Sequence, residues 1–103
     1  MANEFDGPRS RRRYDRVTGP FDGFLEAPVL VYDLNVGGCF VTSSEKPLEG
    51  TTSILKIKLP PEDWITVNAV TLYHFEHGFA VQFLGLDSDT EARIARTVAA
   101  LKR

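Results

Sequence analysis

The sequence contains a single cysteine and only two histidines among its 103 residues. The one cysteine, Cys39, cannot form an internal disulfide and cannot supply a cysteine-rich metal site. Because the apolar residues Phe40 and Val41 follow it, Cys39 is predicted to be a buried and inert thiol. His74 and His77 have no cysteine or carboxylate cluster at ligand spacing around them, so no metal site is expected and both are interpreted as exposed.

Long apolar runs and catalytic motifs are also missing. No apolar stretch approaches the roughly 20 residues that a membrane-spanning helix needs, and the polar N-terminus lacks the apolar stretch of a secretory signal. We therefore expect a cytoplasmic protein without a membrane span. The sequence has no H-E-x-x-H, G-x-S-x-G or G-x-x-x-x-G-K motif, and no nucleophile is paired with a base. A protein that is not an enzyme is expected, with no catalytic residues and no cofactor.

Basic residues gather near the N-terminus, although the chain as a whole carries a net charge of −2. Five of the 12 basic residues lie in one short segment, and all five are arginines: Arg9, Arg11, Arg12, Arg13 and Arg16. From Val17 onward, acidic residues outnumber basic ones. Nucleic-acid binding usually draws on cations spread over a face of the domain. The charge pattern therefore argues against nucleic acid and favours a compact anionic ligand.

The apolar pattern predicts one small domain built largely from short strands. The strand candidates are rich in β-branched and aromatic residues between glycine and proline breaks: residues 28–34, 39–43, 53–59, 64–75 and 78–86. The last two form the best hairpin candidate, with its turn at residues 76–78. Apolar residues alternate with lysines in residues 53–59 until Pro60-Pro61 ends the strand.

The final segment changes its period to that of a helix. Ile94, Val98 and Leu101 recur at i, i+4 and i+7, which is one face of an α-helix. Ser88 and Glu91 have capping-box spacing, so the helix is expected to begin near Ser88. An all-β fold with a terminal helix follows, either a small antiparallel barrel or a sandwich whose opening or flank the helix covers.

Two stretches carry the functional signal: RRRYDRV at residues 11–17 and YDLNVGGCFV at residues 32–41. Taken alone, the first is a solvated basic arm, a nucleic-acid arm or an anion site, and the second is a turn. In an extended segment, Arg12 and Arg16 lie up to ~13 Å apart, so their side chains can converge on opposite ends of a nucleotide-sized ligand. Guanidinium groups bind phosphate or the O6 and N7 atoms of guanine, and they also stack on aromatic rings.

A guanine also needs an acceptor for its N1 and N2 donors. Asp33, on a strand and accompanied by Asn35 and Gly38, provides a carboxylate for that purpose. The pair of motifs resembles the signature of the PilZ domain family, which is R-x-x-x-R followed by [D/N]-x-S-x-x-G. The stretch from Arg12 to Arg16 matches the first motif. The second matches at Asp33 and Gly38, with Asn35 where the family usually has serine.

The resemblance extends to GFAVQFLGL at residues 78–86, which is similar to the family's G-x-x-V-x-F-x-x-L ending, and it covers about residues 12–101. It implies a six-stranded antiparallel PilZ-type β-barrel plus a C-terminal α-helix. Residues 1–10 are then a flexible N-terminal leader, and residues 11–103 are the PilZ domain. The implied ligand is cyclic di-GMP, a bacterial second messenger.

The resemblance also implies roles for individual residues. Arg12 and Arg16 bind phosphate and guanine, and Asp33 binds the Watson–Crick edge of a guanine. Asn35 hydrogen-bonds the ligand near Asp33, and Gly38 permits close backbone approach. Arg11 and Arg13 are further ligand-binding candidates. Arg11 stands just before R-x-x-x-R, a position thought to influence stoichiometry, and it favours binding of a stacked ligand pair.

A cyclic di-GMP sensor is therefore the working hypothesis. The ligand is expected to order the Arg-rich N-terminal segment, and the domain signals to a downstream protein partner in motility, exopolysaccharide synthesis or virulence. One alternative is a ligand-free interaction adaptor of the same fold. Another is a small nucleic-acid-binding barrel, which needs exposed aromatic residues. Tyr14, Phe40 and Trp64 are candidates for that role, but Phe40 and Trp64 are predicted to be core residues.

Overall fold

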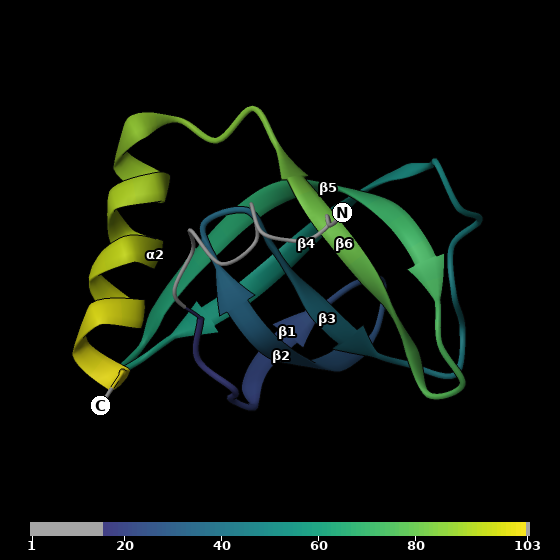
Figure 1. Cartoon of the computed structure of the whole chain (residues 1–103), viewed down its shortest axis with the longest axis horizontal. Coiled ribbons are helices and arrows are strands. Elements are labelled where there is room, and N and C mark those ends of the chain that lie inside the picture. The colour runs from purple at the N-terminus through teal and green to yellow at the C-terminus, as the bar shows by residue number, and fades with distance from the viewer. Residues whose placement is uncertain (1–15, 103) are drawn as a thin grey trace, which may run out of the picture.

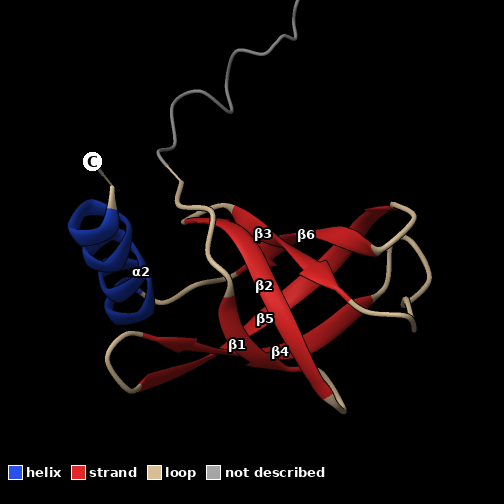
Figure 2. Ribbon diagram, turned by 90° about the horizontal axis from the view of Figure 1, so that it is seen from below, coloured by secondary structure: helices blue, strands red, loops and turns tan. Residues whose placement is uncertain are grey.

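Six strands form one closed antiparallel barrel in the order β1-β2-β3-β6-β5-β4, and a C-terminal helix lies at one end of it (Figures 1 and 2). The computed structural model describes residues 16–102, so the predicted leader, residues 1–10, lies outside the described residues. The predicted six-stranded barrel with a terminal α-helix is confirmed. With the labels of Figure 1, its elements are β1 (Phe21–Phe24), β2 (Pro28–Asn35), β3 (Gly38–Thr42), β4 (Thr52–Leu59), β5 (Asp63–His74), β6 (Gly78–Leu84) and α2 (Ser88–Leu101).

Apolar side chains at every second position of the strands fill the barrel. The inward side chains of β4 and β6 are buried, as their sequence period predicts: Leu55, Ile57, Leu59, Phe79, Val81 and Phe83. Lys56 and Gln82, between them, are exposed. β4 ends immediately before Pro60, since a proline has no N–H for the ladder.

Helix α2 begins where it was expected but is capped by a different residue. Asp87 has an extended backbone, and its carboxylate accepts a hydrogen bond from the Thr90 N–H at 2.7 Å. The predicted capping box of Ser88 and Glu91 is wrong, because Ser88 is already the first helical residue. An aspartate one position earlier takes the capping role and also places a negative charge at the helix N-terminus.

The apolar face of α2 covers one end of the barrel over about two turns. Ile94 and Val98 are buried, but Leu101, the third residue of the predicted apolar helix face, is 46% exposed. The helix ends at Leu101, which borders a surface hollow instead of the core. Arg93 ties the helix to the start of β5, because its Nε donates to the Asp63 carboxylate at 3.0 Å.

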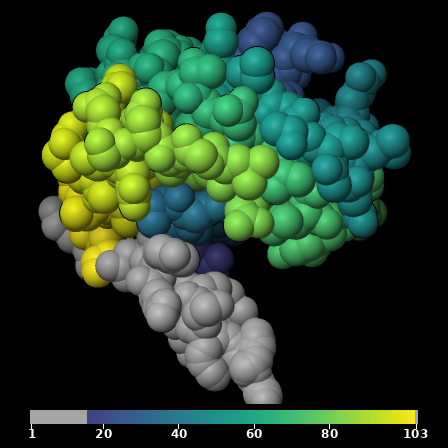
Figure 3. All heavy atoms as spheres, turned by 90° about the horizontal axis from the view of Figure 1, so that it is seen from above, coloured from purple at the N-terminus to yellow at the C-terminus, as the bar shows by residue number. Residues whose placement is uncertain are grey.

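Loops occupy the other end of the molecule. Figure 3 shows the yellow-green atoms of α2 on one side and the teal residues of the β3–β4 region on the other. None of the helices in residues 16–102 has the length and apolar character to cross a bilayer.

Candidate functional site

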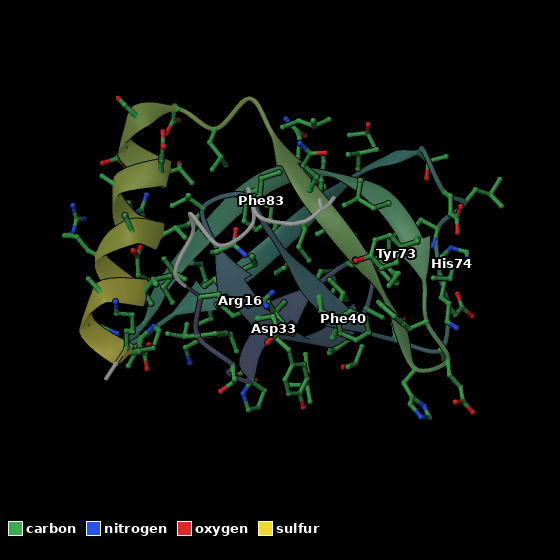
Figure 4. All side chains as sticks on the ribbon, in the orientation of Figure 1. Arg16, Asp33, Phe40, Tyr73, His74 and Phe83 are labelled. Carbon is green, nitrogen blue, oxygen red and sulfur yellow. The ribbon has the colours of Figure 1, made fainter. Side chains whose placement is uncertain are left out.

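The segment before β1 meets the end of β2, and this contact brings the two predicted motifs together. Val17 and Leu34 exchange both backbone hydrogen bonds, at 3.0 and 2.9 Å, in an isolated antiparallel bridge. The Asp33 N–H donates to the Thr18 carbonyl at 3.3 Å. Arg16 is exposed and directly precedes Val17, so the antiparallel bridge places it opposite Asn35, two residues from Asp33. Figure 4 draws the Arg16 and Asp33 side chains in the same region of the molecule. The second arginine of R-x-x-x-R thus lies across from the second motif.

A β-bulge in β2 sets the direction of the Asp33 side chain. The register with β3 shifts between Tyr32 and Asn35, and Asp33 has a φ of +54°, in the left-handed region. Val31 faces the core with no exposure, and the next core residue is Leu34, also with none. Strict alternation would have turned position 33 inward. The extra residue therefore keeps a carboxylate at the surface while Leu34 fills the barrel.

Asn35 holds the turn that follows the bulge. Its Oδ1 accepts hydrogen bonds from the N–H groups of Gly37, at 2.6 Å, and Gly38, at 3.1 Å. A side chain that bonds its own backbone two and three residues on is typical of asparagine in turns. Since the oxygen is directed at the loop, the NH₂ group is the end of Asn35 that can meet a ligand acceptor.

Gly38 makes the closest backbone approach in this turn. A Cβ atom at this position would lie 2.1 Å from the Val81 carbonyl oxygen of the neighbouring strand β6. No side chain fits at that distance, so the last glycine of the motif is required by strand packing. Gly38 therefore allows the close approach of β3 and β6, and its approach to a ligand stays a prediction.

Arg16 also borders a surface hollow of about 470 Å³. Its lining comes from residues 16–21, Pro60, and the C-terminal end of α2 at Leu101 and Lys102. Asp33, Asn35 and Gly38 do not line this hollow, and it is the Val17–Leu34 bridge that places Arg16 at the same end of β2 as these three residues.

The remaining predicted site residues, Arg11, Arg12 and Arg13, lie outside the described residues, as does Tyr14. Their assignment to the ligand site stays a prediction. Arg12 is four residues from Arg16, so a fully extended segment would place it within ~13 Å of that residue.

The sequence analysis did not identify a row of outward-facing aromatic residues, here called the aromatic row, which consists of Tyr32, Phe40, Tyr73 and Phe75. Phe40 is opposite Tyr32 on one side and Ala80 on the other, and Ala80 is opposite Tyr73. The ring centroids of Phe40 and Phe75 lie 5.1 Å apart, and those of Tyr73 and Phe75 are separated by the same distance. Figure 4 shows Asp33, Phe40 and Tyr73 following one another across the molecule.

Two expectations about buried aromatic residues are corrected. Phe40 is only partly buried and Trp64 is 49% exposed, because both lie on the outer face of their strands. The outward direction of Phe40 could have been read from the alternation of inward and outward residues along its strand. Cys39 and Val41 are buried, so Phe40 between them must face outward.

The single thiol, Cys39, is buried, as predicted. Burial raises the pKa of Cys39 well above its ordinary value, and the negative charge of nearby Asp33 raises it further. His74 and His77 are exposed, as expected. Residues 16–102 hold no group of three or more histidine, cysteine or carboxylate side chains placed to bind a metal ion.

A family model described as "PilZ domain" matches residues 10–100. The search of curated proteins gives no match. Among solved structures, the chain resembles an inhibitor of motility, MotI/DgrA of Bacillus subtilis, with a TM-score of 0.78 and 19% identity over 94% of this chain. It also resembles YcgR of Escherichia coli, solved in complex with c-di-GMP, with a TM-score of 0.71 and 20% identity over 90% of this chain.

The two solved proteins are longer than this chain. The matched region covers 57% of the Bacillus protein and 46% of the Escherichia protein, so the chain spans about half of each. At this level of identity the structural similarity establishes the shared barrel-and-helix fold.

Proposed function

Since the chain belongs to the PilZ domain family, we propose that it is a cyclic di-GMP-binding sensor that passes ligand occupancy to a protein partner. The observation that carries this proposal is the Val17–Leu34 bridge. It places Arg16, a cation, across from Asn35 and within two residues of Asp33, a carboxylate. One neighbour has a structure in complex with c-di-GMP and the other is an inhibitor of motility, which supports both the ligand and the kind of pathway. A cytoplasmic location is part of the proposal.

In this proposal, Asp33 accepts hydrogen bonds from N1 and N2 of a guanine, and Arg16 binds a phosphate or stacks on a base. Arg12 performs the matching role at the other end of the ligand. Asn35 donates from its NH₂ group, and Gly38 keeps the turn close to β6. A ligand with two phosphates neutralises arginines that otherwise repel one another, so binding holds the Arg-rich segment before Val17 against the barrel.

Binding of a stacked ligand pair is also proposed, on the basis of Arg11 and, independently, of the aromatic row. Tyr32 directly precedes Asp33, and Phe40 on β3 lies opposite Tyr32. Their ring faces extend the polar site with surfaces on which purines can stack. Titration calorimetry should therefore give two ligands per chain. A stoichiometry of one would contradict the pair while leaving the single site intact.

The central experiment is calorimetry of the full chain with cyclic di-GMP, with cyclic di-AMP as the base control. Replacing Asp33 with alanine removes charge-assisted hydrogen bonds worth about 1.5–3 kcal/mol, so affinity should fall roughly 10- to 150-fold. Arg16→Ala should weaken binding as well. Matched controls are Asp22→Ala on β1 and Arg96→Ala on α2, both exposed. Unchanged affinity in Asp33→Ala and Arg16→Ala would place the ligand elsewhere. A wild-type chain that binds no cyclic di-GMP would favour the ligand-free adaptor.

The aromatic row supports one second candidate, a barrel that binds single-stranded nucleic acid. Tyr73 and Phe75 are each 49% exposed, and successive bases could stack on such rings. Fluorescence anisotropy with a labelled oligothymidine would detect this activity, which should weaken steeply with salt. Binding that requires Tyr73 and falls with salt would establish it.

A further inference from the structure

One seam of the barrel is incomplete. β4 pairs with β5 along its whole length, from Thr52 to Leu59. On its other side it pairs with β1 at only two positions, Gly23 with Ile57 and Phe24 with Lys56. In the described part of the chain, the first half of β4 therefore has a strand neighbour on one side only.

The backbone register shows which groups this half-strand leaves open. The Thr71 N–H of β5 donates to the Thr51 carbonyl, and the pairing of β4 with β5 continues without a register shift. In a regular antiparallel ladder, alternate residues point their N–H and C=O groups to the same side. Residues with odd numbers in β4 thus bond β5. Thr52 and Ile54 direct their N–H and C=O groups away from β5, toward the side where β1 has already ended.

A groove lies along this open edge. It has a volume of about 990 Å³ and is lined by residues 25–28, 43–47 and 52–54. These segments are the β1–β2 turn, the start of the β3–β4 loop and the open half of β4. The loops lie at the end of the molecule away from α2 (Figure 1). Ile54, 62% exposed, gives the groove an apolar contact.

The rim of the groove is acidic. Glu26 and Glu45 are both exposed in it. The ammonium group of Lys46, on the same rim, donates to the carbonyl of Glu76 at 3.0 Å and to that of Phe75. The carbonyl oxygens hold this ammonium group without neutralising it, so the groove lining carries two carboxylates against one cation, a net charge of −1 (−2 + 1). This balance favours a positively charged segment.

We propose that this groove binds an extended, basic segment of a partner protein, which adds to β4 as a further strand. The partner backbone exchanges hydrogen bonds with Thr52 and Ile54, as strands do when they pair with an exposed sheet edge. Its lysine or arginine side chains lie near Glu26 and Glu45, and an apolar side chain contacts Ile54. The groove is at the Pro28 end of β2, and the candidate ligand site is at the Asn35 end. The inference stands without the proposed function and supplies a surface for its partner.

The test uses nuclear magnetic resonance of the ¹⁵N-labelled full chain, with an alternating lysine–valine pentapeptide as the probe. In the free protein, the amide hydrogens of Thr52 and Ile54 should exchange with solvent much faster than those of Ser53 and Leu55, which bond β5. Added peptide should shift the Thr52 and Ile54 resonances and slow their exchange. A glutamate–valine pentapeptide of the same length is the charge control and should bind at least about tenfold more weakly.

Matched changes separate backbone pairing from side-chain contact. Ile54→Pro removes the N–H that faces the groove and no N–H that bonds β5, so peptide binding should fall at least about tenfold. Ile54→Ala keeps that N–H and should retain more of the affinity. If Ile54→Pro fails to fold, methylation of alternate peptide nitrogens removes the same hydrogen bonds from the other side.

Three results would overturn the inference. One is the absence of shifts at Thr52 and Ile54 with ~1 mM peptide. Another is hydrogen exchange at the Thr52 and Ile54 amides of the free monomer that is as slow as at Ser53 and Leu55, which would mean that the edge is already paired. The third is protection that rises with protein concentration, since the occupant would then be a second copy of this chain.

Discussion

Replacing Gly38 with alanine tests whether the last residue of the D-x-N-x-x-G motif serves the fold or the ligand. The added Cβ would lie 2.1 Å from the Val81 carbonyl oxygen, about 1.3 Å short of ordinary van der Waals contact at 3.4 Å. The obstacle is backbone, so β3 or β6 must move. Overpacking of this kind typically costs 1–3 kcal/mol, and because no side chain can yield we expect a value of about 3 kcal/mol. For a domain of this size that lowers Tm by roughly 10–20 °C.

The assay is thermal unfolding followed by circular dichroism, together with calorimetry of cyclic di-GMP. Gly50→Ala is the matched control, since Gly50 has a φ of +87° but no atom within 4 Å of its missing Cβ. The unfolding free energy of Gly50→Ala should fall only by the cost of an alanine in the left-handed region, about 1–2 kcal/mol. If Gly38→Ala melts like the wild type yet loses ligand affinity, the glycine acts through the ligand and the steric reasoning is wrong.

Three further results are expected. Asp87→Ala should destabilise the protein by about 1 kcal/mol in urea unfolding, whereas Ser88→Ala should have little effect. A larger loss of stability in Ser88→Ala than in Asp87→Ala would instead support Ser88 as the helix cap. Arg93 hydrogen-bonds Asp63 and holds the pKa of that carboxyl below its ordinary value of 3.8, so the pair stabilises above that pH and its contribution disappears as pH falls through the lowered pKa. Below about pH 5, the Tm of the wild type should therefore fall more than that of Asp63→Asn; parallel curves would contradict this. Cys39 should not react with a thiol reagent in the native state at about pH 8 but should react fully in denaturant.

The barrel could be predicted because its signals are local. In β4, lysines alternate with Leu55, Ile57 and Leu59, and two prolines stop the strand where the pattern stops. The helix face was predictable only over Ile94 and Val98, since the pattern does not show where the barrel opening ends. Trp64 shows the limit of composition as a guide. A large aromatic residue is expected inside, but its place in the alternation directs it outward.

The candidate site could be named from two motifs but not assembled from them. Arg16 and Asp33 are 17 residues apart, and only the tertiary bridge between Val17 and Leu34 puts them together. The bulge at Asp33 depends on pairing with β3, which a single strand's sequence does not specify. The open edge of β4 was equally hidden, because it follows from where β1 ends on the neighbouring strand.

The bulge in β2 has a consequence for how this stretch can vary in length. Val31 and Leu34 are both completely buried, and β2 has two residues between them where a regular strand would have one. Deleting Asp33 would restore strict alternation, with Leu34 still directed inward and now opposite Cys39. The core therefore does not require the extra residue, and a sequence without it should keep the barrel while losing the surface carboxylate.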